Sequence, residues 1–323
     1  MDYEAFIAEW HNDNPCVLVH TSGSTGTPKA MMVEKHRMEA SARTTCHFLG
    51  LKRGDTALLC MPLDYIAGKM MVVRAITCGL NLICVEPSGH PLAKVDAPID
   101  FAAMVPMQVV NSLNVPAERE KLRAIRHLII GGGAIHPDLE QQLKDFPHAV
   151  WSTYGMTETL SHIALRRLNG REASGWYTPF DGVTVNLDHR GCLVIDAPAV
   201  CDHTLVTNDR AELCDNGFRI LGRIDNVVCS GGIKIQIEEV EQALKPHLTA
   251  PFVITKKRDP ILGEALTLLT EDPHTETIAE LCRTHLPKYQ HPRHIFHVEK
   301  IPLTETGKPA RAKAQAIAAS LTR

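Results

Sequence analysis

Short apolar runs alternate with amphipathic segments through the first half of the chain. Six runs have the length and composition of buried strands: 16–20, 56–61, 81–85, 100–105, 127–132 and 149–155. Helical patterns lie between them, one over 34–49 that Gly50 closes and others over 68–79, 106–113 and 136–146. This alternation predicts an α/β fold, with a largely parallel sheet covered by helices on both faces.

The pattern changes after about residue 170. The segment 183–195 reads as a β-hairpin with a polar turn, and 211–221 reads as a second hairpin with Asn216-Gly217 at the turn. The last hundred residues mix short strands with helical patterns over 236–246, 275–286 and 309–321. We therefore expect two domains, 1–222 with a small β-rich subdomain and 223–323 as a small α+β domain.

Composition limits the possible functions. A chain of 323 residues with 44% hydrophobic and 22% charged residues is large enough for about two globular domains. The net charge of −3 and the lack of basic runs give no indication of a nucleic-acid partner. Charged residues interrupt the longest apolar region, 56–85, so no membrane span is expected. The sequence leaves open whether the protein forms a homodimer.

Cysteine and histidine usage indicates a reduced compartment and no structural metal. The ten cysteines are scattered without a CxxC pair, which predicts buried, reduced thiols in a cytoplasmic protein. The acidic N-terminus does not read as a signal peptide. Among the 17 histidines, His285, His291 and His294 are the closest cluster, but prolines break any helical ligand spacing there, so we expect no zinc site.

The stretch VHTSGSTGTPK is the first candidate for chemistry. It follows an apolar run and contains Thr21, Ser22, Gly23, Ser24, Thr25, Gly26, Thr27 and Lys29. A glycine-rich loop between a strand and a helix can surround phosphates, because its N–H groups converge and no side chain blocks their approach. It is not a Walker A motif, since Lys29 follows Pro28 rather than glycine. Alone, such a tract is more often a surface loop.

Five ordered motifs resemble those of the adenylate-forming superfamily, which includes acyl- and aryl-CoA ligases, carrier-loading adenylation domains and luciferases. They are the loop just described, STYGMTE (152–158), TND (207–209), GRIDNVV (222–228) and PLTETGKPAR (302–311). The resemblance implies the adenylate-forming fold, here with a truncated N-terminal domain, and a requirement for ATP, Mg²⁺ and coenzyme A or a carrier thiol.

The resemblance also implies a role for each matching residue. The loop residues, Lys29 included, would bind the β,γ-phosphates. Tyr154 would stack on adenine, Gly131, Gly132 and Gly133 would form a flat wall, and Asp209 with Arg223 would bind the ribose. Thr157 would contact the α-phosphate, and Glu158 would be the metal ligand. Lys308 would be catalytic, neutralising charge as the acid attacks phosphorus. Asp225 would be the hinge, and Gly231 with Gly232 would face the CoA side.

Each of these residues also has an ordinary structural alternative: a packed tyrosine, turn residues, a helix-start glutamate or a solvated lysine. The segments GGGAIHPDLEQQL and YGMTETLSHIALRRLNG resemble most the small o-succinylbenzoate–CoA ligases of menaquinone biosynthesis. That acid carries two carboxylates, so hydrogen-bond donors or a cation should hold the one that is not activated.

Two cations, Lys69 and Arg74, interrupt the apolar helix expected over 68–79. Their spacing puts them about 140° apart, so both cannot face one mid-helix pocket. Lys69, near the helix start, is expected to reach the substrate, with Arg74 second; alternatively either pairs with an acid such as Asp64. Gly155, Ser161 and His162 are further candidates for the acid pocket.

The sequence departs from the family pattern in three places. Tyr65 stands where relatives often have histidine, TND replaces TGD, and PKA replaces PKG. The expected function is an AMP-forming acid–CoA ligase acting on o-succinylbenzoate. Another aryl- or acyl-CoA ligase, or a protein that loads a carrier, is the alternative. A non-catalytic nucleotide-binding protein would not need Lys308 and Glu158.

Overall fold

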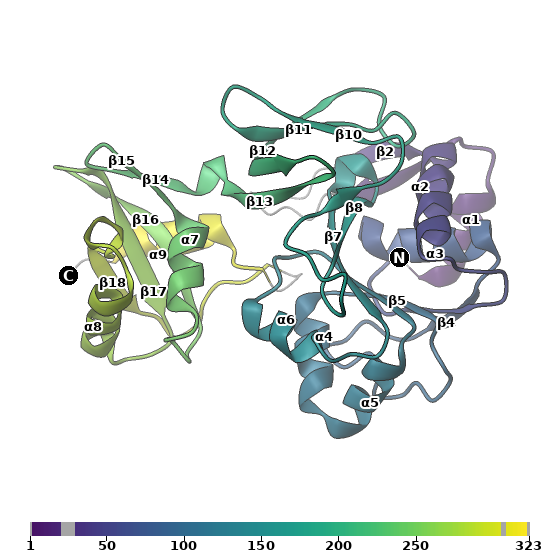
Figure 1. The fold of residues 1–323 in the computed structure, drawn as a ribbon, viewed down its shortest axis with the longest axis horizontal. Coiled ribbons are helices and arrows are strands. Elements are labelled where there is room, and N and C mark those ends of the chain that lie inside the picture. The colour runs from purple at the N-terminus through teal and green to yellow at the C-terminus, as the bar shows by residue number, and fades with distance from the viewer. Residues whose placement is uncertain (1, 21–29, 305–307, 322–323) are drawn as a thin grey trace.

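A computed structural model describes residues 2–20, 30–304 and 308–321. The chain forms a larger lobe up to about residue 222 and a smaller lobe after it, joined by the segment between β13 and β14 (Figure 1). Each of the hydrophobic core clusters lies on one side of this junction: three end by Phe180, Leu168 and Phe218, and two begin at Val228 and Val253. This separation is compatible with two domains, although their exact bounds stay a prediction.

The main sheet of the large lobe has seven strands in the order β4-β3-β5-β6-β7-β8-β9. The strands are β3 (Thr56–Leu59), β4 (Asn81–Cys84), β5 (Phe101–Met104), β6 (His127–Ile130), β7 (Ala149–Gly155), β8 (His162–Arg167) and β9 (Thr178–Pro179). The first five in this order pair in parallel, whereas β8 and β9 are antiparallel. The prediction of a largely parallel sheet is therefore confirmed, with an antiparallel edge.

Helices cover both faces of this sheet, as the alternation predicted. They are α2 (Lys35–Phe48), α3 (Ile66–Cys78), α4 (Pro106–Asn114), α5 (Pro116–Ala124) and α6 (Pro137–Leu143). Successive strand residues point to opposite faces. Phe101 and Ile129 share a core with residues of α2 and α3, while Ala102, Leu128 and Ile130 share one with residues of α4, α5 and α6. Gly50, with φ of 65°, follows α2 as expected.

The start of the chain differs from the expectation. Helix α1 (Tyr3–His11) precedes β1 (Cys16–His20), which pairs antiparallel with β2 (Ala30–Glu34) in a separate two-stranded sheet. The segment 21–29 therefore connects two strands rather than a strand and a helix. The run AMMVE was not recognised as a strand because it directly follows the Gly/Ser tract. The loop residues Thr21 to Lys29 lie outside the described residues.

Four antiparallel strands form the β-rich part of the large lobe, in the order β10-β11-β12-β13. They are β10 (Thr184–Leu187), β11 (Cys192–Asp196), β12 (Leu205–Cys214) and β13 (Gly217–Arg223). Both predicted hairpins are present. In the second, Cys214 pairs with Gly217, so the turn residues are Asp215 and Asn216, one position earlier than predicted.

The small lobe is an α+β unit, as predicted. Its strands are β14 (Val227–Ser230), β15 (Ile233–Gln236), β16 (Phe252–Asp259), β17 (Gly263–Thr270) and β18 (His294–His297). Its helices are α7 (Ile237–Leu244), α8 (Thr275–His285) and α9 (Arg311–Ser320). Short 3₁₀ turns are η1 (Thr157–Thr159), η2 (Ile224–Asn226) and η3 (Lys288–Gln290). Residues of α7 and α8 share one core cluster, and residues of α9 belong to another.

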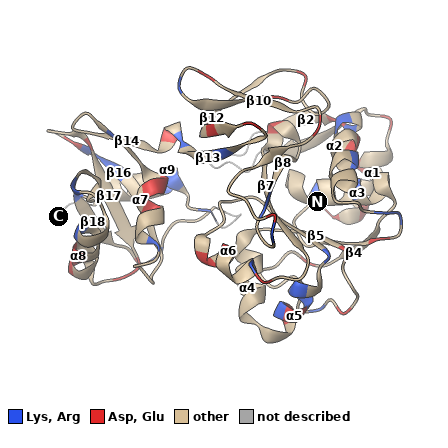
Figure 2. Ribbon diagram, viewed as in Figure 1, with Lys and Arg blue, Asp and Glu red and all other residues tan. Residues whose placement is uncertain are grey.

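Acidic and basic residues are interspersed along both lobes (Figure 2). In the described part of the chain, no helix is both long and apolar enough to cross a membrane. All ten cysteines are free, as expected, but Cys84, Cys214 and Cys229 are exposed. The expectation that the thiols are buried was wrong for these three, because each lies in a strand with one face or end open to solvent.

Candidate functional site

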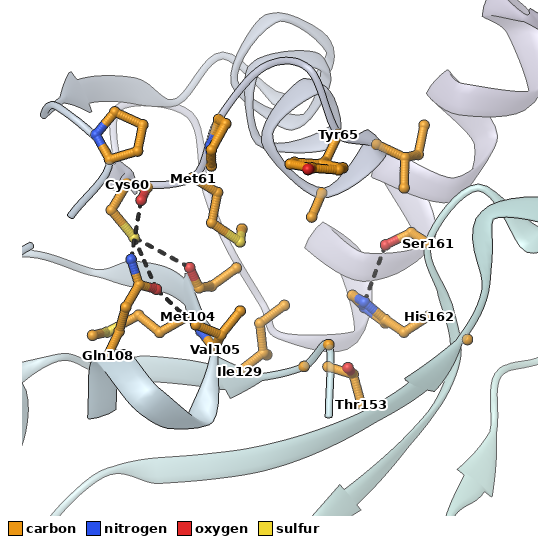
Figure 3. Close-up of a pocket in the computed structure, with 18 of the residues that line it drawn as sticks. Cys60, Met61, Tyr65, Met104, Val105, Gln108, Ile129, Thr153, Ser161 and His162 are labelled. Carbon is orange, nitrogen blue, oxygen red and sulfur yellow. Dashed lines mark hydrogen bonds between the residues drawn. The ribbon is translucent and has the colours of Figure 1, made fainter. Parts of the chain in front are cut away.

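A cavity of about 480 Å³ lies where the parallel strands of the main sheet end (Figure 3). Its walls include Cys60 after β3, Met104 in β5, Gly131 after β6 and Gly155 at the end of β7. Ligand sites of open α/β sheets form at this edge, because the carboxyl ends of parallel strands and their following loops converge there. The topology thus places residues of the STYGMTE and PLTETGKPAR segments around one hollow, whereas no residue of TND or GRIDNVV lines it.

Close approach of neighbouring atoms explains two of the glycines in this wall. A Cβ on Gly155 would lie 2.2 Å from the carbonyl oxygen of Ser161, and one on Gly131 would lie 2.5 Å from Oγ1 of Thr153. Both distances are far below any real contact. A side chain at Gly155 would have to displace the backbone of Ser161 and His162, and one at Gly131 would have to displace the Thr153 side chain. The structure places Gly131, Gly132 and Gly155 in the cavity wall. Gly133 lies beside them, near Lys308.

Arg74, in α3, is a buried cation that lines the cavity with only 2% of its surface exposed. Its Nη2 donates to Oγ of Ser161 at 2.6 Å, and its Nε has no hydrogen-bond partner within the described residues. None of the ion pairs found between described residues includes Arg74. Burial lowers the pKa of Arg74 to about 10. A buried, charged guanidinium without a carboxylate partner is costly, and an anion in the cavity would offset that cost.

Lys69 does not line the cavity, so the expectation that it reaches the substrate first was wrong. Its Nζ donates to the carbonyl oxygen of Leu18 at 2.7 Å and forms an ion pair with Glu9 at 3.4 Å. The amine also lies 5.1 Å from the centre of the Phe6 ring. The predicted separation of Lys69 and Arg74 on the helix holds, but α1 and β1 supply the partners of Lys69 and leave the cavity to Arg74.

Ser161 and His162 line the cavity next to Arg74 (Figure 3). Nδ1 of His162 lies 3.2 Å from Oγ of Ser161, and its Nε2 lies 3.1 Å from Oγ1 of Thr45. Burial, and secondarily the charge of Arg74, holds the pKa of His162 well below its usual range. The imidazole is therefore neutral and adds a polar, uncharged group to the arginine end of the cavity.

Lys308 reaches the same cavity from the small lobe, through the segment before α9. Its Cε lies 3.9 Å from the position that a Cβ of Gly133 would occupy. Burial and the nearby charge of Arg223 lower the pKa of Lys308, while Asp209 acts in the opposite direction. The cavity therefore has a cation at two places, with Lys308 contributed by one lobe and Arg74 by the other.

Asp209 and Arg223 pair across β12 and β13, beside Tyr154. Nη1 of Arg223 donates to Oδ1 of Asp209 at 3.0 Å, and the Tyr154 hydroxyl donates to Oδ2 at 2.7 Å. The Tyr154 ring packs edge-on against Phe218 with 5.0 Å between ring centres. Nη2 of Arg223 donates to Oδ2 of Asp225 at 2.8 Å. The predicted ribose residues are thus in direct contact with the predicted hinge.

Of the remaining predicted residues, some line the cavity and others do not. Thr157 lines it, whereas Glu158 is exposed in η1 and is not part of its wall. Gly231 and Gly232, with φ of 58° and 84°, form the two-residue turn between β14 and β15. The phosphate-loop residues, including Lys29, lie outside the described residues. The metal role of Glu158 therefore stays a prediction.

Among the described residues, one group has ligand atoms close enough for a metal ion, and it was not predicted. It consists of Cys201, Asp202 and His203, consecutive residues of which the last two are exposed. It lies outside the cavity walls. Of the histidines considered from the sequence, His285 stacks on His247 with 3.4 Å between ring centres.

Sequence reasoning missed several residues of the cavity wall, notably His20, Ser88, Met107 and Gln108. The Gln108 side chain is buried, and its Nε2 donates to the carbonyl oxygens of Cys60 and Ser88 at 3.1 and 3.0 Å. It therefore connects the end of β3 to the loop after β4. A glutamine within the apolar run PMQVVNSL was the one available signal.

Comparisons with known proteins identify the family of the chain. A family profile described as "AMP-binding enzyme" matches residues 4–197. A 2-succinylbenzoate–CoA ligase of Escherichia coli is 26% identical over 304 residues, which are 89% of this chain and 66% of that protein. The Haemophilus influenzae 2-succinylbenzoate–CoA ligase is 28% identical, covering 75% of this chain and 56% of that protein. The chain thus spans less than two thirds of the length of these two curated relatives.

Solved structures share the fold. An acyl-CoA synthetase (AMP-forming)/AMP-acid ligase II-like protein from Dyadobacter fermentans is 36% identical, with a TM-score of 0.66 and coverage of 96% of this chain and 91% of that one. The o-succinylbenzoate coenzyme A synthetase from Bacillus subtilis, in complex with ATP and magnesium, has a TM-score of 0.76 at 21% identity, covering 92% and 69% of the two chains.

Proposed function

Since the chain belongs to the AMP-binding enzyme family, we propose that it is an AMP-forming acid–CoA ligase acting on an aromatic dicarboxylate. The observation that carries this proposal is the cavity with Lys308 at one place and the unpaired Arg74 at another. The two relatives described above are named 2-succinylbenzoate–CoA ligases, which makes o-succinylbenzoate the first substrate to test.

The proposed reaction has two steps. A carboxylate oxygen of the acid attacks the α-phosphorus of ATP, forming the acyl-adenylate while the bond to pyrophosphate breaks. The sulfur of CoA, after losing its proton, then attacks the acyl carbon, and the bond to AMP breaks. Negative charge develops at the α-phosphate in the first step, and a cation placed beforehand in a partly dry site stabilises it.

Each residue has a part in this proposal. Lys308 would contact the reacting carboxylate and the α-phosphate, with the Thr157 hydroxyl beside it. Asp209 would accept hydrogen bonds from the ribose hydroxyls. For both carboxylate oxygens to take part, the hydrogen bond that the Tyr154 hydroxyl donates to Oδ2 would have to break. Mg²⁺ would be held by the phosphates of ATP and by Glu158, since a hard cation prefers oxygen ligands. The loop residues 21–29 would bind the outer phosphates.

Arg74 supplies the specificity. With Lys308 at the activated carboxylate, a second carboxylate on the substrate would bind to Arg74 and Ser161, which also line the cavity. A monocarboxylic acid would leave Arg74 buried and unpaired, whereas a dicarboxylate would neutralise it. The other walls of the cavity are mainly apolar, include Met104 and Ile129, and suit an aromatic ring.

The proposal has two further parts. The chain would divide into domains 1–222 and 223–323, with the second turning about Asp225 between the two steps, so that Gly231 and Gly232 face the cavity during thioester formation. The protein would act in the cytoplasm, where its ten free thiols would stay reduced.

The test is pyrophosphate exchange and CoA ligation with a panel of acids. We expect exchange with o-succinylbenzoate that depends on Mg²⁺, and AMP and thioester in equal amounts once CoA is added. Benzoate and a medium-chain fatty acid are the monocarboxylate comparisons. If either is used better than o-succinylbenzoate, the substrate assignment is wrong. If adenylate forms but CoA is not acylated, a carrier thiol is the acceptor instead.

A further inference from the structure

Asn208 connects the strand that carries Asp209 to the 3₁₀ turn between the lobes. Its Nδ2 donates to both carboxylate oxygens of Asp225, at 3.1 and 3.2 Å, and its Oδ1 accepts from Nη1 of Arg190 at 3.2 Å. Asn208 is half-buried, and Asp225 is exposed in η2. The side chain therefore spans from the large lobe to the first residues of the junction.

Arg223 makes a second connection to the same carboxylate. Its guanidinium bonds to Asp209 through Nη1 and to Asp225 through Nη2. Asp225 thus receives hydrogen bonds from two neighbouring strands, β12 through Asn208 and β13 through Arg223. A turn of the small lobe that changed φ of Asp225, or the backbone angles just before it, would move this carboxylate and would have to break or rearrange these bonds.

We propose that Asn208 is a positioning residue that holds the small lobe in the orientation that puts Lys308 in the cavity. The inference rests on the proposed function, because it concerns the step that needs Lys308. The more usual sequence TGD has glycine at this position and could not make the contact. Asn208 would thus be a feature of this chain that favours the first half-reaction over the second.

The size of the effect follows from the chemistry of the bond. A neutral amide that donates to an exposed carboxylate contributes modestly, because water competes for both groups. Between two orientations of similar free energy, such a bond shifts the populations by a few-fold. Loss of the bond should therefore make the Lys308-in orientation rarer by about 3- to 10-fold, without abolishing it.

The experiment measures the two half-reactions separately in Asn208→Ala. Acid with ATP gives the rate of adenylation, and supplied acyl-adenylate with CoA gives the rate of thioester formation. We expect adenylation to slow by about 3- to 10-fold while thioester formation is equal or faster. Asn208→Asp should slow adenylation more, because it places a second acid beside Asp225. A mutation that merely loosened the fold would slow both steps.

Asn186→Ala is the matched control. Asn186 is an exposed asparagine of β10 in the same sheet, and its side chain makes none of the hydrogen bonds found between described residues. Both half-reactions should keep their unmutated rates in this variant. Equal slowing of both steps in Asn208→Ala, or no slowing of adenylation, would overturn the inference.

A second measurement does not depend on activity. Limited trypsin digestion reports how often the junction opens, through cleavage between Arg223 and Ile224 into fragments 1–223 and 224–323. This cleavage should be several-fold faster in Asn208→Ala than in the unmutated protein or in Asn186→Ala. Equal rates would overturn the inference. If the unmutated protein forms no adenylate with any acid, the proposed function fails, and the digestion still decides the role of Asn208.

Discussion

Arg74 has an unusual position for an arginine, because its guanidinium is buried and no described carboxylate pairs with it. Desolvating a charge without a partner destabilises a folded protein, so such residues persist where a ligand supplies the missing charge. The nearby Ser161 hydroxyl satisfies one N–H, and Nε remains unbonded. Replacing Arg74 by an uncharged residue should therefore weaken the binding of a dicarboxylate but should not destabilise the free protein.

We predict that Arg74→Met raises the KM for o-succinylbenzoate by about 10- to 100-fold, since a charge-assisted hydrogen bond contributes about 1.5–3 kcal/mol. Methionine fills similar volume without a charge, so the melting temperature should stay equal or rise. Steady-state kinetics and thermal unfolding measure the two effects. The KM for ATP serves as the internal control and should not change. A fall in melting temperature with an unchanged KM for the acid would show that Arg74 is structural.

His162 predicts a dependence of stability on pH. Its folded pKa lies well below 6.5, because burial and the charge of Arg74 disfavour the imidazolium. Below about pH 6.5 the unfolded chain binds a proton that the folded protein does not, so the free energy of unfolding falls as the pH falls. The loss should approach about 1.4 kcal/mol for each further pH unit, until the folded pKa is reached.

His162→Gln should remove this contribution and flatten the decline in the free energy of unfolding between pH 6.5 and 5.5. Denaturant unfolding at a series of pH values measures it. The exposed His189 provides the control, because its substitution by glutamine should leave the slope unchanged. Parallel pH profiles for the unmutated protein and His162→Gln would contradict the prediction.

At the scale of elements, α3 shows how far the sequence could be interpreted. The helix and its C-terminal glycine followed from periodicity, and the angular separation of Lys69 and Arg74 followed from helix geometry. Which of the two faces the cavity did not follow. It depends on the partners of Lys69, which come from α1 and β1, and a helical wheel contains no information about either element.

The same limit applies to the rest of the cavity. The strands and their glycine-rich ends were predictable because apolar runs and turns are local signals. The pairing of β1 with β2 was not, since pairing depends on contacts across a segment whose composition alone resembles a linker. Ser88 and Met107 enter the wall only because the topology brings the loop after β4 beside α4. No local pattern marks them.

The contact of α3 with α1 and β1 can be tested through Lys69. Lys69→Met should lower the free energy of unfolding by about 1–3 kcal/mol, because the Leu18 carbonyl and Glu9 lose a charged donor. The KM for the acid should stay within about two-fold, since Lys69 is not in the cavity wall. Thermal unfolding together with Glu9→Gln and the double variant gives the coupling between the two residues. A large rise in KM with unchanged stability would restore Lys69 as a substrate residue.

At the scale of the whole molecule, the proposed active site belongs to both lobes. The large lobe supplies most of the cavity wall, Arg74 and the residues proposed to bind the ribose, and the small lobe supplies Lys308. Asp209, Arg223 and Asp225 form one chain of hydrogen bonds from the proposed ribose site to the junction. A ribose bound to Asp209 would alter the hydrogen bond between Asp209 and Arg223, and thereby the bond between Arg223 and Asp225. Nucleotide binding and the orientation of the small lobe should therefore be coupled.

Lys308 distinguishes the two half-reactions. Loss of a cation that stabilises developing charge costs on the order of 3 kcal/mol, or about 100-fold in rate. If the small lobe turns about Asp225 before the thiol attacks, Lys308 has left the cavity by then. Lys308→Ala should therefore lose adenylation yet still convert supplied acyl-adenylate and CoA to thioester.

Asp225→Pro, which restricts the backbone at the hinge, should keep adenylation and lose thioester formation. It is compared with Asp225→Ala, which lacks the same carboxylate. Lys300→Ala, an exposed lysine of the small lobe, is the control. Product is timed by rapid quench from both starting points, and equal loss of both steps in Lys308→Ala would exclude lobe rotation as the means by which this protein separates them.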